Sequence, residues 1–357
     1  MIRPHFDFIG KKWIWFAASG TIIVIGLIAV LLGGLHFGVE FQGGTLLDIK
    51  FAKTQPSVAE IRKTVAPFKM EESVIQLKEG NEALIRTRRL STTEVNEVEN
   101  ALKKSLKVTA VSTTTVGPGW GDQVTNGAIK ALLFSLLVLV IYISIRFEYK
   151  MALASLVAIF HDIFVVIGVY AILGLVADRL SGGALAFLPQ EVTPNTVAAL
   201  LTILGYSLYD NIVVFHRIQE NTPLIGKRTY SEMANDSVNQ VLLRSINTSL
   251  ASLIPIVVLL LFGGDTLKDF AFVLFVGMIS GAYSTIFIGS PVFAMLKEIE
   301  PRYRVARERF AGAREAMPLA EAGERLAEEF EGPEPAPSQA RATAAQKAKK
   351  KKKKKRR

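Results

Sequence analysis

The sequence contains no cysteine among its 357 residues, so disulfide bonds and cysteine-ligated metal centres are excluded. Charged residues are scarce as well, at 21% of the chain, whereas half of the residues are hydrophobic and the mean hydropathy is positive. Soluble proteins rarely combine these values. The composition therefore indicates an integral membrane protein.

The motifs of soluble enzymes are also missing. The sequence has no Walker-type phosphate loop, no zinc-binding H-E-x-x-H and no nucleophile elbow. Each of these motifs fixes a phosphate, a metal or a nucleophile at a defined turn or helix face, so soluble-type catalysis has no candidate site. We expect no enzymatic activity, no bound metal and no cofactor.

The net charge of +10 is confined to the C-terminus. Residues 347–357 hold ten of the 42 lysines and arginines, and the rest of the chain balances 32 basic against 32 acidic groups. The alternative that the protein binds nucleic acid therefore rests on this C-terminal tract alone, because the rest of the chain has no excess positive charge. Such a tract is commonly a solvated tail, and it could also bind anionic lipid or the ribosome.

Six hydrophobic stretches are long enough to cross a membrane, which takes about 20 residues at a rise of about 1.5 Å each. The first is too long for the core of a signal peptide and no cleavage site follows it, so we expect it to be retained. The stretches are 13–35, 128–145, 151–176, 196–215, 238–262 and 270–296.

Lysine and arginine gather in the short loops on one side of these stretches. This asymmetry predicts a multi-pass protein of the cytoplasmic (inner) membrane with both termini cytoplasmic. The basic residues on that side are Arg3, Lys11, Lys12, Arg146, Lys150, Arg217, Lys227 and Arg228, and the opposite short loops hold only Arg179 and Lys268.

The long loop 36–125 has the pattern of a small domain. Two S-x-x-E capping boxes begin helices, and a Gly-Asn pair separates two strand-like segments as in a hairpin. With strands expected over 40–51 and 107–116, the order is β-α-β-β-α-β, which is the ferredoxin-like arrangement and identifies no function by itself. The capping boxes are Ser57 with Glu60 and Ser91 with Glu94, and the turn is Gly80-Asn81.

The sequence thus predicts a polytopic α-helical membrane protein with six transmembrane helices and an extracytoplasmic α+β ferredoxin-like domain between helices 1 and 2. The cytoplasmic N-terminus and first span occupy residues 1–35, and the external domain occupies 36–125. The other five spans lie within 126–298. Residues 299–357 form a charged cytoplasmic tail with a helix over 302–331 and a disordered polybasic end.

Three spans carry ionisable residues, and each buried charge costs roughly 2.5–3.5 kcal/mol on insertion scales. Asp210 in the fourth span and Arg244 in the fifth are expected at similar depths, about 10 Å below the cytoplasmic surface. They are therefore natural partners, either as a structural ion pair or as a titratable switch. His161 and Asp162 in the third span lie near the bilayer middle, where they could relay protons or hydrogen-bond between helices.

Glycine and proline in the last two spans also indicate how the helices pack. Gly277 and Gly281 form a small-xxx-small face, which is typical of close helix packing. Pro255 is a candidate kink or hinge in the fifth span.

Taken together, these motifs resemble the SecD/SecF family of protein-export membrane subunits, within the resistance-nodulation-division superfamily, and its SecF branch in particular. Segment 38–45, G-V-E-F-Q-G-G-T, is similar to the family's G-x-D-F-x-G-G-T, and 205–221 is similar to its G-Y-S-x-N-D-[ST]-I-V-V-x-D-R-I-R-E-N. The pair His161-Asp162 and the tripeptide at 243–245 fall where the family has equivalents. The motif residues are Gly38, Glu40, Phe41, Gly43, Gly44, Tyr206, Ser207, Asp210 and Asn211.

The sequence departs from the family pattern close to its central aspartate. Tyr209 and Asn211 flank Asp210 in place of asparagine and of threonine or serine, so its hydrogen-bonding surroundings are expected to differ from those usual in the family. The other departures are Glu40 and His216, each in place of aspartate, and Gln219 in place of arginine.

The resemblance implies use of the proton motive force to promote preprotein translocation, with SecD as the partner that supplies six further spans. It also implies the SecYEG translocon with SecA-driven preprotein as partners, with YajC and YidC as additional ones. Protonation of Asp210 would weaken its pairing with Arg244, and His161 and Asp162 would share the coupling. The coupling ion stays open between proton and sodium. A small-solute exporter of the superfamily and a structural subunit that stabilises SecD are the alternatives.

Overall fold

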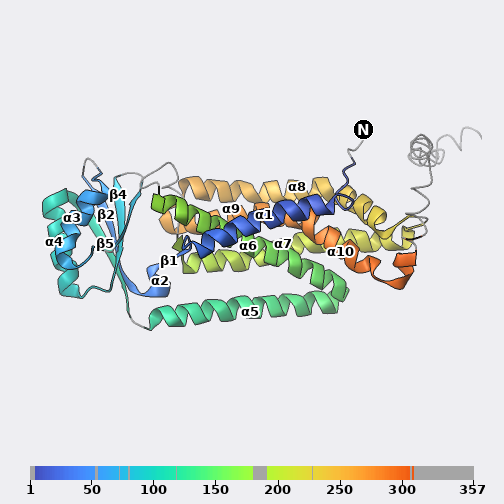
Figure 1. Cartoon of the computed structure of the whole chain (residues 1–357), viewed down its shortest axis with the longest axis horizontal. Helices are drawn as coiled ribbons and strands as arrows, with labels where there is room; N and C mark the ends of the chain where they lie inside the picture. Colours follow the sequence, from blue (N-terminus) through green and yellow to red (C-terminus); the bar gives the residue numbers. More distant parts are fainter. Residues whose placement is uncertain are drawn as a thin grey trace, which may run out of the picture.

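The computed structural model describes residues 5–52, 55–71, 73–78, 81–117, 119–179, 191–226, 228–305 and 308. A bundle of long helices carries a small sheet domain at one end (Figure 1). We call this end of the bundle the domain side and the opposite end the far side. Outside the described residues lie Arg3, Gly80, Lys227, most of the predicted tail helix and the polybasic tract.

All six predicted spans are confirmed as helical segments long and apolar enough to cross a membrane. Several extend past their apolar stretch, because polar capping groups begin the helix outside it. α8 begins at Tyr230, where Thr229 and Glu232 form a capping box, and it contains Pro255 without ending. The spans are α1 (Lys12–Leu31), α5 (Trp120–Arg146), α6 (Tyr149–Arg179), α7 (Pro194–Asn221), α8 (Tyr230–Phe262), and α9 (Asp265–Ser284) continued by the π-helical turn Thr285–Gly289 and by α10 (Ser290–Glu298).

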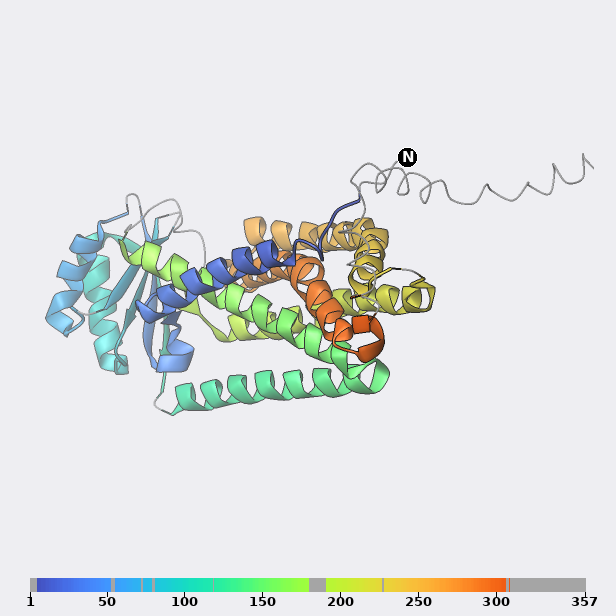
Figure 2. The same ribbon diagram turned by 45° about the vertical axis from the view of Figure 1, so that its right-hand side comes forward.

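The six spans differ in how much of their surface is buried within the bundle. Helices α6, α7 and α9 form the buried centre of the bundle, whereas α1, α5 and α8 leave most of their apolar side chains exposed. Both views show α5 standing apart from the other helices along much of its length (Figures 1 and 2). The bundle of this single chain therefore exposes broad apolar faces, as a membrane protein does toward lipid or a partner.

The sheet domain has the predicted ferredoxin-like topology. Its four antiparallel strands lie in the order β3-β4-β2-β5, and its apolar core includes Leu47, Ile85 and Leu102. Both predicted capping boxes form. The elements are β2 (Gly44–Phe51), α3 (Val58–Val65), the short helix Ala66–Phe68, β3 (Val74–Lys78), β4 (Glu82–Thr87), α4 (Thr92–Leu106) and β5 (Val108–Val116).

The junction between the domain and the bundle differs from the predicted strand over 40–51. A helical turn, α2 (Val39–Gln42), precedes β2, and the chain reverses through Gly43 and Gly44 at φ values of 75° and 130°. Only glycine adopts such values readily, so the two glycines of the motif allow this turn. Just before α2, the two-residue strand β1 (His36–Phe37) pairs in parallel with β6 (Glu191–Val192), which leads into α7.

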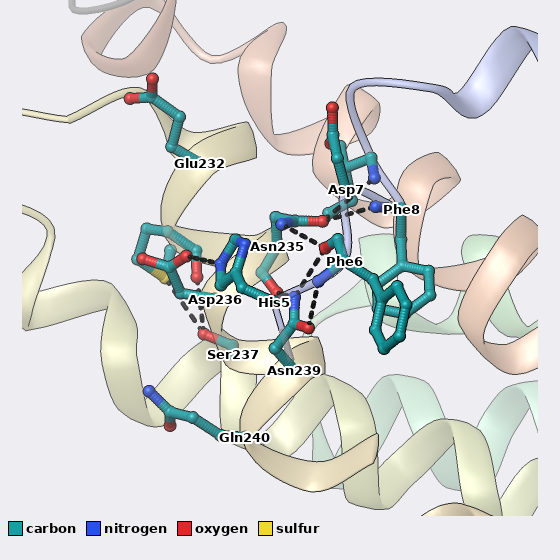
Figure 3. A network of polar contacts seen from close by, with 12 residues as sticks. His5, Phe6, Asp7, Phe8, Glu232, Asn235, Asp236, Ser237, Asn239 and Gln240 are labelled. Atoms are coloured by element: carbon teal, nitrogen blue, oxygen red, sulfur yellow. Dashed lines mark hydrogen bonds and ion pairs between the residues drawn. The ribbon is translucent and has the colours of Figure 1, made fainter. Parts of the chain in front are cut away.

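The N-terminal segment is attached to the far side of α8 (Figure 3). The Asn235 side chain accepts hydrogen bonds from the backbone of Phe8 at 2.8 Å and Ile9 at 3.2 Å, and it donates to the carbonyl of Phe6 at 2.9 Å. His5 Nε2 lies 2.8 Å from the Asp236 carboxylate. These contacts fix the direction in which the chain enters α1.

Candidate ion-coupling site

Asp162 lies at the centre of the bundle with 1% of its surface exposed. Its carboxylate accepts hydrogen bonds from three serine hydroxyls: Ser207 of α7 at 2.8 Å, and Ser280 and Ser284 of α9 at 2.6 and 3.0 Å. The aspartate therefore connects α6 to both α7 and α9 through hydroxyl donors.

His161 belongs to the same centre. Its Nδ1 lies 3.1 Å from Asp162, and its ring stacks on Tyr283 with centroids 5.9 Å apart. The Tyr283 hydroxyl in turn is 3.1 Å from the Ser19 hydroxyl of α1. The structure thus brings the predicted pair His161 and Asp162 together with side chains of three neighbouring helices, α1, α7 and α9.

The helix that follows these serines changes its winding. α9 gives way at Thr285 to a π-helical turn that ends at Gly289, and both residues are buried. Such turns are rare and frequently occur at functional sites. The widened turn lies directly after Ser284, where it faces α6 and α7.

Asp210 is buried on α7. The predicted ion pair between Asp210 and Arg244 is wrong: among the described residues, the two side chains do not contact each other. Both carboxylate oxygens of Asp210 lie 2.7 Å from the hydroxyl of Ser245 on α8. Adjacent residues on a helix point about 100° apart, so when Ser245 faces α7 the side chain of Arg244 points away from Asp210. Arg244 is exposed on the outside of the bundle.

Arg244 instead lines an open groove between α7 and α8, toward the far side, with a volume of about 780 Å³. Arg217 in the same groove donates to Gln240 at 2.6 Å and pairs with Glu220, which also lies 3.5 Å from His216. The groove therefore presents a cationic lining on an outer face of the bundle.

The structure places the two departures from the family pattern that flank Asp210 in different surroundings. Tyr209 points outward and is 61% exposed, so it does not contact the carboxylate centre. Asn211 is buried and donates to the Ser207 carbonyl at 2.9 Å, while its Oδ1 has no hydrogen-bond partner among the described residues. One turn earlier, Tyr206 donates to Ser249 of α8 at 3.2 Å.

The two glycines of α9 have different neighbours. A Cβ on Gly277 would come within 2.1 Å of Ile203, so this position requires glycine for α7 to approach. A Cβ on Gly281 would lie 3.3 Å from Ser207 and 3.6 Å from Asp162, next to the carboxylate centre. The predicted packing role is thus clear for Gly277, and Gly281 also borders the candidate site.

A third buried aspartate, Asp269 at the domain side of α9, was missed by the sequence analysis. It accepts hydrogen bonds from Tyr170 of α6 at 2.6 Å and from Thr193 and Thr196 at the start of α7. Asp269 precedes the apolar stretch 270–296, so from sequence it resembled an ordinary loop acid. The T-P-x-T pattern at 193–196 was the available signal for a helix start beside it.

The motif residues of segment 38–45 lie at the junction between the helix bundle and the sheet domain. Arg86 of β4 forms a buried ion pair with Glu191, donates to the Phe37 carbonyl at 3.3 Å and lies near Glu40. Burial lowers the pKa of Arg86 to about 10, an effect that the negative charge of Glu40 partly offsets. We call Arg86, Glu191, Phe37 and Glu40 the joint.

The remaining motif glycine also serves this junction. Gly38 donates from its backbone to the Val192 carbonyl at 2.9 Å, and a Cβ at Gly38 would come within 2.4 Å of the Glu40 carboxylate. Phe41 packs edge-on against Phe37 at 5.9 Å, and its carbonyl leaves no room for a Cβ on Gly121 of α5. Among the described residues, no group of three or more His, Asp or Glu is arranged to hold a metal.

Two family descriptions match the sequence. The C-terminal region of the SecD/SecF protein export membrane proteins matches residues 96–299, and the SecD/SecF GG motif matches residues 28–55. The protein translocase subunit SecF of Streptomyces coelicolor is 37% identical over 335 residues, which cover 91% of this chain and 86% of that protein. The SecF of Rhodothermus marinus is 34% identical, with 87% and 98% covered.

Solved structures of SecDF are similar in fold. The crystal structure of SecDF, a translocon-associated membrane protein from Thermus thermophilus, has a TM-score of 0.74 and 34% sequence identity, covering 84% of this chain and 39% of that one. A second SecDF structure, in a super-membrane-facing form, has a TM-score of 0.60 and 33% identity, covering 87% and 40%. This chain therefore spans about two fifths of those SecDF chains.

Proposed function

This chain belongs to the SecF branch of the SecD/SecF protein-export family, and from that premise we propose that it uses a transmembrane proton gradient to promote preprotein translocation. The observation that carries the proposal is the pair of buried carboxylates, Asp162 and Asp210, each held by serine hydroxyls from neighbouring helices. No cation is paired with either aspartate among the described residues, apart from the ionisable His161. Uptake of a proton is thus a direct way to neutralise these buried charges.

Protonation would change the contacts between helices. An ionised aspartate accepts on both oxygens, so Asp162 holds α7 and α9 through three hydroxyls at once. In a protonated carboxyl, one oxygen carries the proton and donates it. That oxygen then no longer accepts the hydrogen bond that a serine hydroxyl donates to the ionised form. At Asp210 the same change weakens the contact with Ser245 that links α7 to α8. The proton would therefore loosen the centre of the bundle.

The partner follows from the exposed faces. We propose that SecD covers the α7–α8 face, where the exposed Arg244 lines the cationic groove, because a carboxylate of a partner helix would neutralise its charge within the membrane. The complex would act beside SecYEG and SecA, with YajC and YidC as further partners, and with both termini cytoplasmic. The fused SecDF relatives support the pairing with SecD.

The test uses inverted membrane vesicles that contain the SecD–SecF pair. Asp162→Asn and Asp210→Asn keep side-chain size and remove the titrating group, so both are expected to abolish the stimulation of preprotein translocation by a proton gradient. Asp122→Asn, at an exposed position of α5, is the matched control and should keep full stimulation. Undiminished stimulation in both membrane variants would contradict the proposal.

The same assay distinguishes proton coupling from the alternative that this chain only stabilises SecD. A subunit that only stabilises SecD would retain stimulation in Asp162→Asn as long as the complex assembles, which copurification measures. The exporter alternative has less support, because the matching relatives are named as translocase subunits.

A further inference from the structure

Asp269 is a buried acid at the domain side that the proposed coupling through Asp162 and Asp210 does not use. Only 7% of its surface is exposed, although it lies on α9 just inside the domain-side end of the bundle. Three hydroxyls converge on it from two other helices: Tyr170 from α6, and Thr193 and Thr196 from α7. A surface aspartate in a loop would have no reason to collect these donors.

The two threonines also form the capping box that begins α7. Thr193 Oγ1 accepts from the Thr196 backbone at 3.3 Å, and Thr196 Oγ1 accepts from the Thr193 backbone at 2.9 Å. Because both hydroxyls accept from N–H groups, their own protons are free to point at Asp269. In the usual capping box the third helical residue supplies the carboxylate. Here that residue is Thr196, and the carboxylate comes from another helix.

The start of α7 is in turn attached to the sheet domain. Val192, next to Thr193, pairs with Phe37 and accepts from the backbone of Gly38 at 2.9 Å. Glu191, the preceding residue, forms the ion pair with Arg86 on β4. A continuous series of contacts therefore runs from Asp269 through Thr193 and β6 to the joint.

We infer that Asp269 is a positioning residue that transmits protonation at the domain side of the bundle to the sheet domain through the start of α7. The inference rests on the proposed proton coupling and adds the route by which it reaches the domain. Ionised, Asp269 accepts from both threonines and holds the capping box. Protonated, it must donate from one oxygen, so one hydroxyl turns away and β6 loses its anchor on α9.

The titratable groups around Asp269 are few. Among the described residues, its hydrogen-bond partners are Tyr170 from α6 and the hydroxyls of Thr193 and Thr196 from α7. On α9 its neighbour is Lys268. Within β1 and β6, His36 packs beside Gly174 of α6, one turn from Tyr170, and Glu191 is engaged by Arg86. The direct hydrogen-bond partners of Asp269 are therefore the hydroxyls of Tyr170, Thr193 and Thr196.

An apolar layer separates Asp269 from the central aspartate. Tyr170 and Asp162 are eight residues apart on α6, or about 12 Å. Between these levels lie the buried side chains of Val166, Ile203 and Leu274. A proton that enters from the domain side thus meets Asp269 before it can reach Asp162.

The experiment measures the position of the domain in the SecD–SecF complex. Because the chain has no cysteine, spin labels can be placed at Lys104→Cys on α4 and Phe262→Cys at the domain-side end of α8, both exposed, with a cysteine-free SecD. The distance distribution between the labels is recorded in proteoliposomes at pH 7.5 and pH 5.5. The parent is expected to shift on acidification, and Asp269→Asn is expected to show the acidic distribution at both pH values.

Further variants separate transmission from folding. Asp269→Glu keeps the titrating group and should restore the shift, and Asp122→Asn should leave it unchanged. The pair Arg86→Gln and Glu191→Gln breaks the joint outside the bundle, so it should abolish the shift without lowering the melting temperature of the helices. A parent-like shift in Asp269→Asn, or a parent without any shift, overturns the inference. If Asp162→Asn still abolishes proton-stimulated translocation in that case, the proposed function stands and only the route through Asp269 fails.

Discussion

Hydroxyl groups donate hydrogen bonds to three buried aspartates of this bundle, and His161 lies beside one of them. Asp162 and Asp269 each accept from three hydroxyls, and Asp210 accepts from Ser245. Hydroxyl donors stabilise an ionised carboxylate but leave its charge uncancelled, unlike a salt bridge. This arrangement is the basis of the proton uptake that we propose for Asp162 and Asp210.

Replacing Ser245 tests which residue serves Asp210. Ser245→Ala removes a hydrogen bond to a charged group, worth about 1.5–3 kcal/mol, and leaves the carboxylate without that donor. We expect reduced proton-stimulated translocation and a lower melting temperature of the complex. Thr248→Ala is the control, because the Thr248 hydroxyl donates to backbone carbonyls of its own helix. Equal effects of the two variants would argue against a special role for Ser245.

The start of α4 gives a pH prediction outside the membrane. The hydrogen bond from Arg88, followed by those from the backbone and side chain of Ser91, lowers the pKa of Glu94 from 4.5 to about 2. A lowered folded-state pKa means that stabilisation is present above about pH 4.5 and is lost as the pH falls toward 2. Amide hydrogen exchange at the first turn of α4 should therefore accelerate, relative to the intrinsic rate, across this range.

A variant identifies the source of that pH dependence. Glu94→Gln should show the faster exchange already at pH 6, whereas Glu97→Gln, at an exposed position of the same helix, should behave as the parent does. Parent-like protection in Glu94→Gln would exclude the ionised carboxylate of Glu94 as the cause of the pH dependence.

The buried aspartates were easier to predict from the sequence than the side chains that contact them. Depth along a helix follows from residue number, so Asp210 and Arg244 were placed at similar levels, but depth does not say which way a side chain points. The adjacent Ser245 faces Asp210 instead. Asp269 was missed because its donors come from two other helices, one of them through a capping box that the apolar pattern does not reveal.

At the scale of elements, glycine controls how closely α9 approaches α7. A Cβ at Gly277 would overlap Ile203, whereas a Cβ at Gly205 would meet nothing within 4 Å. Gly277→Val should therefore destabilise the bundle by about 1–3 kcal/mol through overpacking. Gly205→Ala should be neutral or stabilising by up to about 1 kcal/mol, because alanine favours a helix. Melting temperatures in detergent measure both, and Ile203→Ala should partly rescue Gly277→Val.

The N-terminal segment makes a separate element-scale prediction. Asn235 serves three backbone groups of residues 6–9 (Figure 3). Asn235→Ala leaves those groups without partners, at a cost of about 1–3 kcal/mol for each one that stays buried. Limited proteolysis should then cleave residues 5–9 faster, while Asn195→Ala, on the opposite side of the bundle, should not change the rate. Unchanged cleavage in Asn235→Ala would mean that other contacts hold the segment.

The elements themselves were largely predictable. Hydropathy predicts the spans, because a run of about 20 apolar residues is the length needed to cross the hydrocarbon core of a membrane. The capping boxes Ser57–Glu60 and Ser91–Glu94 predict where two helices of the sheet domain begin. Residues 40–42 of the turn α2 were predicted as strand, because the conformation of this turn depends on Gly43 and Gly44. The pairing of β1 with β6 joins residues far apart in sequence, which no local pattern reports.

At the scale of the whole molecule, buried aspartates lie at two levels along the bundle, and an ion pair connects the bundle to the sheet domain. Asp162 and Asp210 lie inside the bundle, Asp269 lies toward the domain side, and the joint at Arg86 and Glu191 connects the start of α7 to the sheet domain. The broad apolar faces of α1, α5 and α8 agree with a chain that works with further membrane helices. We propose that protons drive the translocation cycle of this assembly.

The most direct measurement of that claim is preprotein translocation into inverted vesicles with the proton and sodium gradients collapsed separately. A proton ionophore is expected to lower translocation to the level of Asp162→Asn vesicles, and to have no further effect on those vesicles. Collapse of the sodium gradient alone should change nothing. Translocation that resists the proton ionophore, or falls only when the sodium gradient is removed, would contradict the account.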